Sequence, residues 1–117
     1  MPIERHGIGP KMSQVNIHGG KTVYLAGQVA KAKAGASIRE QTQEILDNVE
    51  QHLASVGSGK VRILQATILL GYMKDFDEMN SVWDNWIPAE HTPGRACYEA
   101  QLSRAALGVE VIVVAAR

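Results

Sequence analysis

Four features are scarce in this chain of 117 residues: cysteine, aromatic side chains, net charge and long hydrophobic runs. The single cysteine excludes an intrachain disulfide framework and favours a reducing compartment, so we expect a cytoplasmic protein. Twelve basic residues balance twelve acidic ones, which argues against nucleic acid as a partner, because such binders usually carry a basic stripe. No apolar run approaches the roughly 20 residues of a membrane helix, and residues 1–10 lack the apolar segment of a signal peptide.

What the chain does have is enough hydrophobic residues, 45%, for one small core, and its length predicts a single domain over residues 1–117. Near the start, two short runs with alternating or β-branched residues, 15–18 and 22–26, predict strands. The pair Gly19-Gly20 between them is typical of a hairpin turn. A further short strand is expected near Ile3.

Two later segments begin with the sequence pattern of a helix N-terminus. Ser37 and Glu40 form an S-x-x-E capping box ahead of a stripe of apolar residues at helical spacing. Asp75 and Glu78 stand in the same relation, and the apolar pattern that follows them ends before Pro88. The sequence therefore predicts one long and one shorter helix.

The remaining strands are predicted at residues 61–72, 94–102 and 109–115. Around Ile68 and Val113 the residues are apolar at consecutive positions, which is typical of strands covered on both faces. Two helices can cover only one face of a sheet of five or six strands, so the other face needs a partner. In a chain this short we expect that partner to be a second copy, which predicts a homo-oligomer.

Most standard catalytic constellations are absent. The four histidines show no HExxH or H-x-H pairing, and Cys97 has no CxxC neighbour, so we expect no metal. The early glycines do not lead from a strand into a helix with Lys-Ser/Thr, and no G-x-S-x-G elbow is present. Phosphate-loop and serine-hydrolase chemistry are therefore not supported.

Two charged residues stand out against apolar or strand surroundings. Arg95 opens one late strand, where its guanidinium fork suits an acidic ligand, and Glu110 interrupts the apolar run LGVEVIVVAA. From the pattern alone, the alternative is that these two side chains pair with each other or face solvent at a sheet edge. Cys97 has the pattern of a small core residue, and Trp83 and Trp86 favour core packing over a ligand platform.

At these residues the sequence resembles the reactive-intermediate deaminase family, also called Rid, YjgF-like or L-PSP. The matching motifs are H-T-P-G-R-A-C-Y-E-A-Q-L at 91–102, V-E-V-I-V-V-A-A at 109–116, and Gly27-Gln28 after an early strand. Two more are Q-T-x-x-I-L-x-N-V in the first helix and D-F-x-x-M-N-x-x-W in the second. The likeness covers essentially the whole chain and is nearest to the YoaB-like branch.

The resemblance implies a chorismate-mutase-like α+β fold: a mixed sheet of five to six strands with two helices on one face. It also implies a homotrimer with a barrel core and clefts between subunits. Family members hydrolyse reactive enamines and imines of the 2-aminoacrylate type to 2-oxo acids and ammonia, without metal or cofactor. By this resemblance Arg95 would hold the substrate carboxylate, the backbone of Cys97 would help to position it, and Glu110 would orient or activate the attacking water.

Two other functions remain open at this point. The first is a non-catalytic regulatory module that binds a small carboxylate, because Gly9-Pro10 is followed by Lys11 and Met12 where family deaminases often carry a tyrosine. The second is a ribonuclease or translation inhibitor, names that are attached to some relatives. The zero net charge and the lack of a basic run count against this last reading.

Overall fold

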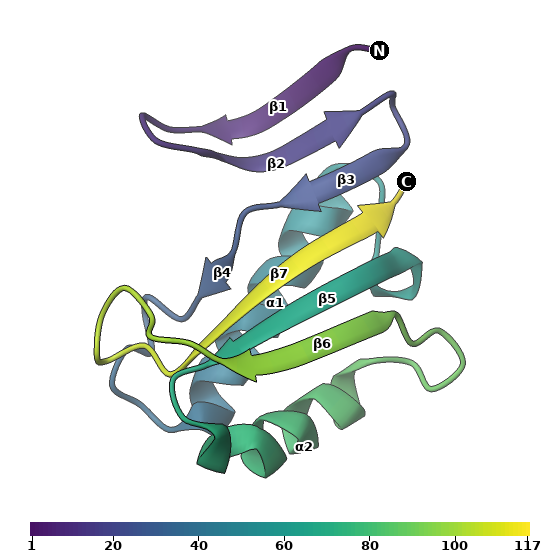
Figure 1. Ribbon diagram of the computed structural model, residues 1–117. Helices are drawn as coiled ribbons and strands as arrows, with labels where there is room; N and C mark the ends of the chain where they lie inside the picture. Colours follow the sequence, from purple (N-terminus) through teal and green to yellow (C-terminus); the bar gives the residue numbers. More distant parts are fainter.

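The computed structural model describes residues 1–117 as a seven-stranded mixed sheet with two helices packed against it (Figure 1). In chain order the elements are β1 (Ile3–Ile8), β2 (Ser13–His18), β3 (Thr22–Leu25), β4 (Gln28–Val29), α1 (Ile38–Ser55), β5 (Ile63–Leu70), α2 (Phe76–Trp86), β6 (Gly94–Glu99) and β7 (Val109–Ala116). Short 3₁₀ turns at Lys60–Arg62 and Met73–Asp75 precede β5 and α2.

The strands are ordered β1-β2-β3-β7-β5-β6, and β4 pairs with β7 beyond the end of β3. Only β5 and β6 run parallel, because the helix α2 connects them as a crossover; all other pairs are antiparallel. The predicted element order is confirmed, including a strand at Ile3, but the predicted count of five to six strands is wrong. The extra strand is β4, whose two residues are too few to show any periodicity.

The two helix starts differ from each other. In α1 the Ser37 half of the predicted capping box forms, since the Glu40 backbone N–H donates to Ser37 Oγ at 3.1 Å. The Glu40 carboxylate accepts from the Ser37 hydroxyl at 3.2 Å instead of from a backbone N–H. The box predicted at Asp75 and Glu78 is wrong, because the Asp75 side chain makes no capping hydrogen bond. A 3₁₀ turn leads into α2 and leaves Asp75 at φ −89°, ψ 3° rather than extended. Glu78 Oε1 instead accepts the Arg39 backbone N–H at 3.3 Å.

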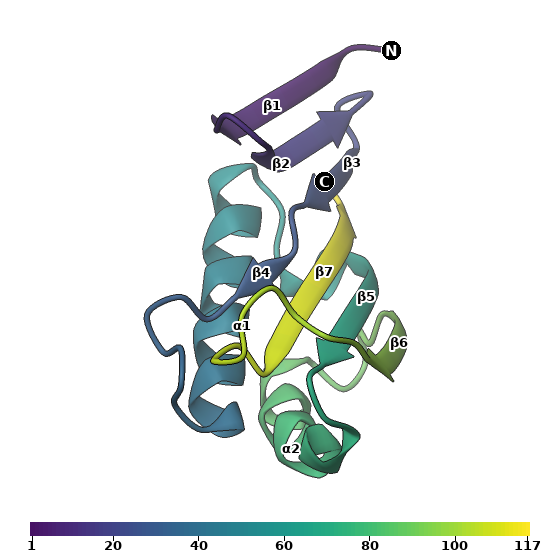
Figure 2. The same cartoon turned by 60° about the vertical axis from the view of Figure 1, so that its left-hand side comes forward.

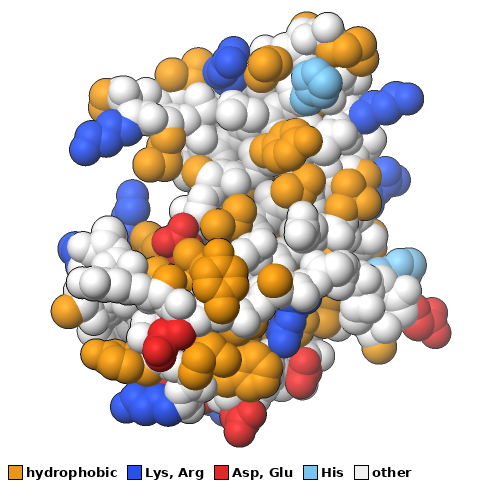
Figure 3. Space-filling model, in the orientation of Figure 1, with side chains coloured by type: hydrophobic (Ala, Val, Ile, Leu, Met, Phe, Trp, Pro, Cys, Tyr) orange, Lys and Arg blue, Asp and Glu red, His pale blue; other side chains and the backbone are white.

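Both helices lie on one face of the sheet, as predicted (Figure 2). In β7 the side chains of Val109, Val111, Val113 and Ala115 are buried toward the helices, while those between them are only half-buried. We call the side without helices the open face. Figure 3 looks onto it and shows hydrophobic side chains gathered over the middle of the sheet. Neither helix has the length and apolarity needed to cross a membrane.

Candidate functional site

Arg95 lies on β6, at the edge of the sheet, and reaches toward α2. In the parallel register it sits beside Ala66, which is fully buried on the helix side. Its guanidinium donates from Nη1 to Asn80 Oδ1 at 2.7 Å, and its Cζ lies 5.4 Å from the centroid of the Trp83 ring. Arg95 is nevertheless exposed, so the rest of its fork is open to a ligand.

Glu110 lies on β7, between β4 and β5, and its register partners are Val29 and Leu69. It belongs to the half-buried set of β7, so its side chain starts from the open face. A Cβ on Gly27 would run into the Glu110 carboxylate oxygen, so only glycine leaves room for this side chain in its present place. The glycine of the Gly27-Gln28 motif thus makes room for the Glu110 carboxylate.

The Glu110 carboxylate borders a cavity of about 640 Å³ at the break between β3 and β4. Most of its lining is polar: Met12, Gln14, Gly27, Gln28, Val29, Lys31, Glu44, Asn48, Gln51, His52, Ser103 and Glu110. Gln28 is 7% exposed, and its amide nitrogen donates to Gln14 Oε1 at 3.2 Å and to the Ala26 carbonyl at 2.9 Å. These bonds fix the polypeptide on one side of the cavity.

Arg95 and Glu110 do not meet within one chain. Strand β5 separates them, their register partners on it are three residues apart, and their side chains leave opposite faces of the sheet. Neither takes part in an ion pair with the other. The alternative in which the two charges simply pair with each other is therefore wrong, because the alternation of strand side chains forbids it.

Cys97 follows Arg95 by two residues and shares its face of β6. Its side chain is half-buried against the core, beside Ile68 in the register. Burial raises the pKa of the Cys97 thiol, and the nearby positive charge of Arg95 opposes that rise. Since β6 is an edge strand, part of its backbone hydrogen-bonding capacity has no partner strand in this chain, which leaves peptide groups free for a ligand.

The two residues that follow Gly9-Pro10 differ in position, and the histidine of the H-T-P-G-R motif lies in a loop. Met12 lines the Glu110 cavity, whereas Lys11 is exposed and does not line it. His91 lies in the loop before β6, where its backbone N–H donates to the Pro88 carbonyl at 2.9 Å. No group of three or more His, Cys, Asp or Glu side chains lies close enough together to hold a metal ion.

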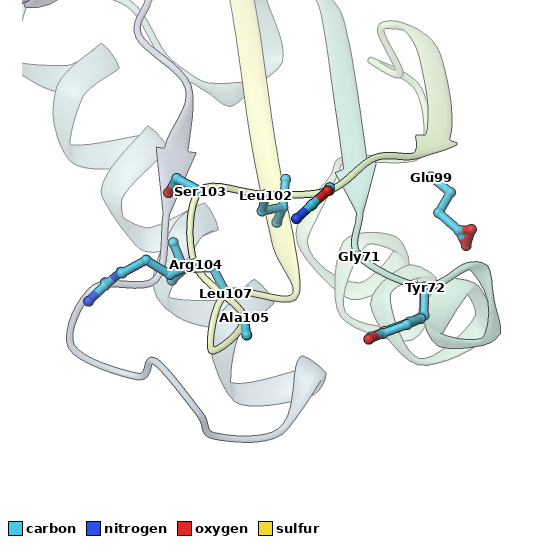
Figure 4. A pocket seen from close by; sticks show the side chains of 9 residues that line it. Gly71, Tyr72, Glu99, Leu102, Ser103, Arg104, Ala105 and Leu107 are labelled. Carbon is cyan, nitrogen blue, oxygen red and sulfur yellow. The ribbon is translucent and has the colours of Figure 1, made fainter.

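A second cavity, of about 440 Å³, lies between the end of β5 and the loop that precedes β7 (Figure 4). Tyr72 and Glu99 lie at one side of it, while Arg104 extends the other way from the loop. The Glu99 carboxylate is already engaged by the Met73 backbone N–H at 3.3 Å. Its charges do not converge on one point, so we take the Arg95 and Glu110 positions as the candidate site.

Pattern reasoning missed Asn80 and Trp83 as partners of Arg95. They stand three residues apart on α2, in the motif D-F-x-x-M-N-x-x-W, so they share one face of the helix. That spacing was a usable signal. Which strand this helix face lies beside is a property of the tertiary fold.

An α+β sheet with this strand order, two helices on one face and an arginine on the edge strand defines a known class of protein. The Endoribonuclease L-PSP family model matches residues 9–117. A crystal structure from Neisseria meningitidis, described as a member of the YjgF protein family, superposes with a TM-score of 0.95 at 37% identity, covering 100% of this chain and 96% of that one. An uncharacterized Pseudomonas aeruginosa protein gives a TM-score of 0.94 at 41% identity over 99% of both chains.

Curated relatives agree with this assignment. The RutC family protein YoaB of Escherichia coli K12 is 38% identical over 116 residues, 99% of both chains. A RutC family protein of Haemophilus influenzae is 37% identical over 115 residues, 98% of both chains. The chain therefore belongs to the Endoribonuclease L-PSP family, known also as the Rid or YjgF family, and within it to the YoaB-like branch. More distantly, a Bos taurus protein named 2-iminobutanoate/2-iminopropanoate deaminase is 27% identical over 97 residues, 79% of this chain and 69% of the relative.

Proposed function

We propose that this protein hydrolyses small reactive enamines and imines, of the 2-aminoacrylate and 2-imino acid type, to 2-oxo acids and ammonia. The proposal rests on two charged groups: the Arg95 guanidinium, which is held at the edge strand β6, and the Glu110 carboxylate, which has room only because residue 27 is glycine. The distant relative named as an imine deaminase supports the same chemistry. The single cysteine favours a cytoplasmic protein. The family resemblance implies a reaction that needs no cofactor.

The site that we propose is completed between subunits. Arg95 and Glu110 leave opposite faces of their own sheet, so a substrate that touches both must lie between two copies of the chain. The open face supports association, because Tyr24 and Tyr98 on it are 47% and 53% exposed while Ile112 and Val114 lie beside them. We propose a homotrimer in which three open faces form a barrel core and the three seams form clefts.

In this proposal the chemistry is simple, because the imine carbon is already electrophilic. The Arg95 fork binds the substrate carboxylate and the Cys97 backbone helps to align it. Glu110 holds a water molecule and accepts one of its protons while the water oxygen bonds to the imine carbon. Passing that proton to the imine nitrogen gives a carbinolamine. The second proton of the water then moves from the new hydroxyl to the nitrogen, the carbon–nitrogen bond breaks as the carbonyl forms, and ammonia leaves the 2-oxo acid. Overall, one imino acid and one water give one 2-oxo acid and one ammonia.

A second candidate is a regulatory module that binds a small carboxylate without consuming it. The specific observation that favours it is Met12, which lines the Glu110 cavity and supplies no proton donor or acceptor suited to catalysis. A ligand that stabilises the protein and is recovered unchanged would support this function. A ribonuclease activity has less support, because twelve acidic residues offset the twelve basic ones.

The test generates iminopyruvate in situ and compares its hydrolysis by the wild type, Arg95→Ala and Glu110→Gln. We expect both variants to lose about 100-fold or more in kcat/KM. The two inactive proteins are then unfolded, mixed in equal amounts and refolded together. If the site lies between subunits of a trimer, about a quarter of the sites in random mixtures contain both intact residues and regain activity.

The outcomes separate the parts of the proposal. Wild-type hydrolysis no faster than buffer rejects the deaminase function. Active wild type with no recovery in the mixture rejects the shared cleft, since a site within one chain cannot be repaired by mixing. Co-refolded wild type, prepared in the same way, controls for losses on refolding.

A further inference from the structure

Arg95 is the one arginine that contacts a tryptophan ring in this structure, and it does so with a second partner on the same helix. Its Cζ lies 5.4 Å from the Trp83 centroid, and its Nη1 donates to Asn80 Oδ1 at 2.7 Å. A guanidinium is planar and rigid, so two contacts to different partners together restrict its position and orientation. An exposed arginine would otherwise sample many rotamers, and ordering it at the moment of binding would reduce affinity.

The support under Arg95 is itself rigid. Trp83 is 5% exposed and packs against Trp86, with ring centroids 5.5 Å apart and planes tilted by 53°. Trp86 is anchored in turn, because its indole N–H donates to Glu50 Oε1 at 2.6 Å. The ammonium of Lys60 lies 5.5 Å from the centroid of the Trp86 ring. The guanidinium therefore rests on the core of the molecule rather than on a mobile surface residue.

The contacts leave the useful edge of Arg95 free. A guanidinium has five N–H donors, and Asn80 takes up one of them. Two parallel donors are needed to bind a carboxylate in the bidentate way. The contact with Trp83 is made to the aromatic ring and forms no hydrogen bond to an oxygen acceptor, so four of the five donors have no protein acceptor and two of them can take the carboxylate.

We infer that Trp83 and Asn80 are positioning residues that hold the Arg95 guanidinium ready for a planar carboxylate, and that the Trp83 indole senses when the carboxylate is bound. This role rests on the proposed function, because it takes Arg95 as the ligand of the substrate carboxylate. A carboxylate on Arg95 partly neutralises the charge above the indole, and indole emission depends on the charges around the ring. Trp83 thus gives the site a built-in signal that does not depend on turnover.

The experiment uses pyruvate as the probe and the two tryptophans of the chain as a matched pair. Trp86→Phe leaves Trp83 as the only tryptophan, whereas Trp83→Phe leaves Trp86. We expect pyruvate to change the emission of the Trp86→Phe protein in a saturable way and to leave that of the Trp83→Phe protein nearly unchanged. Adding Arg95→Ala to Trp86→Phe shifts the Trp83 emission even without ligand and abolishes the response to pyruvate.

Affinity is measured separately by calorimetry. Trp83→Phe and Asn80→Ala each weaken pyruvate binding about fivefold, since each removes one restraint on the guanidinium. Val82→Ala is the control: Val82 lies on the same helix, is similarly buried at 5% exposure and makes no hydrogen bond or cation–π contact with Arg95, so affinity stays within about twofold. In an Arg95→Ala background the Trp83 and Asn80 changes have no further effect on binding. For turnover, the same two changes raise KM more than they lower kcat.

Two results overturn this role, and they are distinguishable from failure of the proposed function. If Trp83→Phe and Asn80→Ala bind pyruvate as tightly as the wild type, the positioning role is wrong while the function stands. If removal of Arg95 leaves the emission of Trp83 unchanged, the contact between Arg95 and Trp83 is wrong. If the wild type binds no pyruvate, Arg95 does not bind the substrate carboxylate, and the proposed function is contradicted as well. Asn80 is half-buried rather than in the core, so Asn80→Ala keeps the test decisive even if Trp83→Phe folds poorly.

Discussion

The two ends of the proposed site are built in different ways. The Arg95 end is supported: a hydrogen bond and an aromatic ring on α2 hold the guanidinium at a sheet edge. The Glu110 end is open: its carboxylate has the bare backbone of Gly27 against it, a cavity of about 640 Å³ beside it, and no ion pair. A group that binds a fixed charge benefits from rigidity, whereas a group that handles water needs space. Each chain carries one end of each kind, and the two ends face different ways.

The largest loss of activity is expected when the chains no longer associate, because the proposed site needs Arg95 of one chain and Glu110 of another. Ile112 lies on the open face, in the middle of β7, so Ile112→Lys places a charge in the proposed trimer interface. We expect light scattering to show a monomer with wild-type secondary structure by circular dichroism, and no measurable deaminase activity. Val61→Lys, at a residue that is 49% exposed before β5, is the control and should remain a trimer. A monomeric wild type would contradict the proposed trimer. A trimeric Ile112→Lys protein would show that the open face is not its interface.

The next effect tests the open end. Gly27→Ala forces the Glu110 carboxylate to move, because the new Cβ would overlap with its oxygen. Since the end of a flexible side chain gives way at low cost, we expect little change in melting temperature but about a 100-fold loss in kcat. Gly59→Ala is the matched control, with no atom within 4 Å of the added Cβ and an extended φ of −174°. Equal activity of the two alanine variants would show that the position of Glu110 does not matter.

A smaller effect is expected at the supported end. Arg95→Lys keeps the charge but loses the planar fork and the fit to Asn80 and Trp83. We expect pyruvate affinity to fall about tenfold, less than in Arg95→Ala, and kcat to change less than KM. Calorimetry and steady-state kinetics measure the two quantities. A lysine variant that binds like the wild type would mean that charge alone matters at this end and that its rigidity has no role.

The smallest effect concerns Cys97, beside Arg95. Burial raises the pKa of its thiol, so in the folded protein the thiol stays protonated to a higher pH than in the unfolded chain. The thiolate is the reactive form, so at pH 8 we expect Cys97 to react with a disulfide reagent a few-fold more slowly when folded than when unfolded. The rate should rise as the pH increases past the raised pKa. Faster reaction in the folded protein would show that the charge of Arg95 outweighs burial.

Local patterns determined much of the fold. The Gly19-Gly20 turn, with φ of 62° and 71°, joins β2 and β3 as predicted, and the Ser37 cap starts α1. These features depend on a few neighbouring residues, so the chain encodes them locally. The element order followed from periodicity, and the placement of both helices on one face followed from their number against five or six strands and from the family resemblance. Arg95 and Glu110 could be chosen as candidates because charges in strand patterns need a reason.

Long-range pairing decided the rest. Strand β4 exists only through the pairing of its two residues with β7. Asp75 does not cap α2 because a 3₁₀ turn leads into that helix. Above all, the sequence by itself identifies Arg95 and Glu110 as candidates but does not show that β5 lies between them. The side chains of any strand alternate between its two faces. Strand pairing and register decide which of the two sets faces the helices, and they also decide which strands separate two residues. The tertiary structure alone placed the arginine beside Trp83 and the carboxylate beside Gly27, at the break between β3 and β4 and across β5 from the arginine.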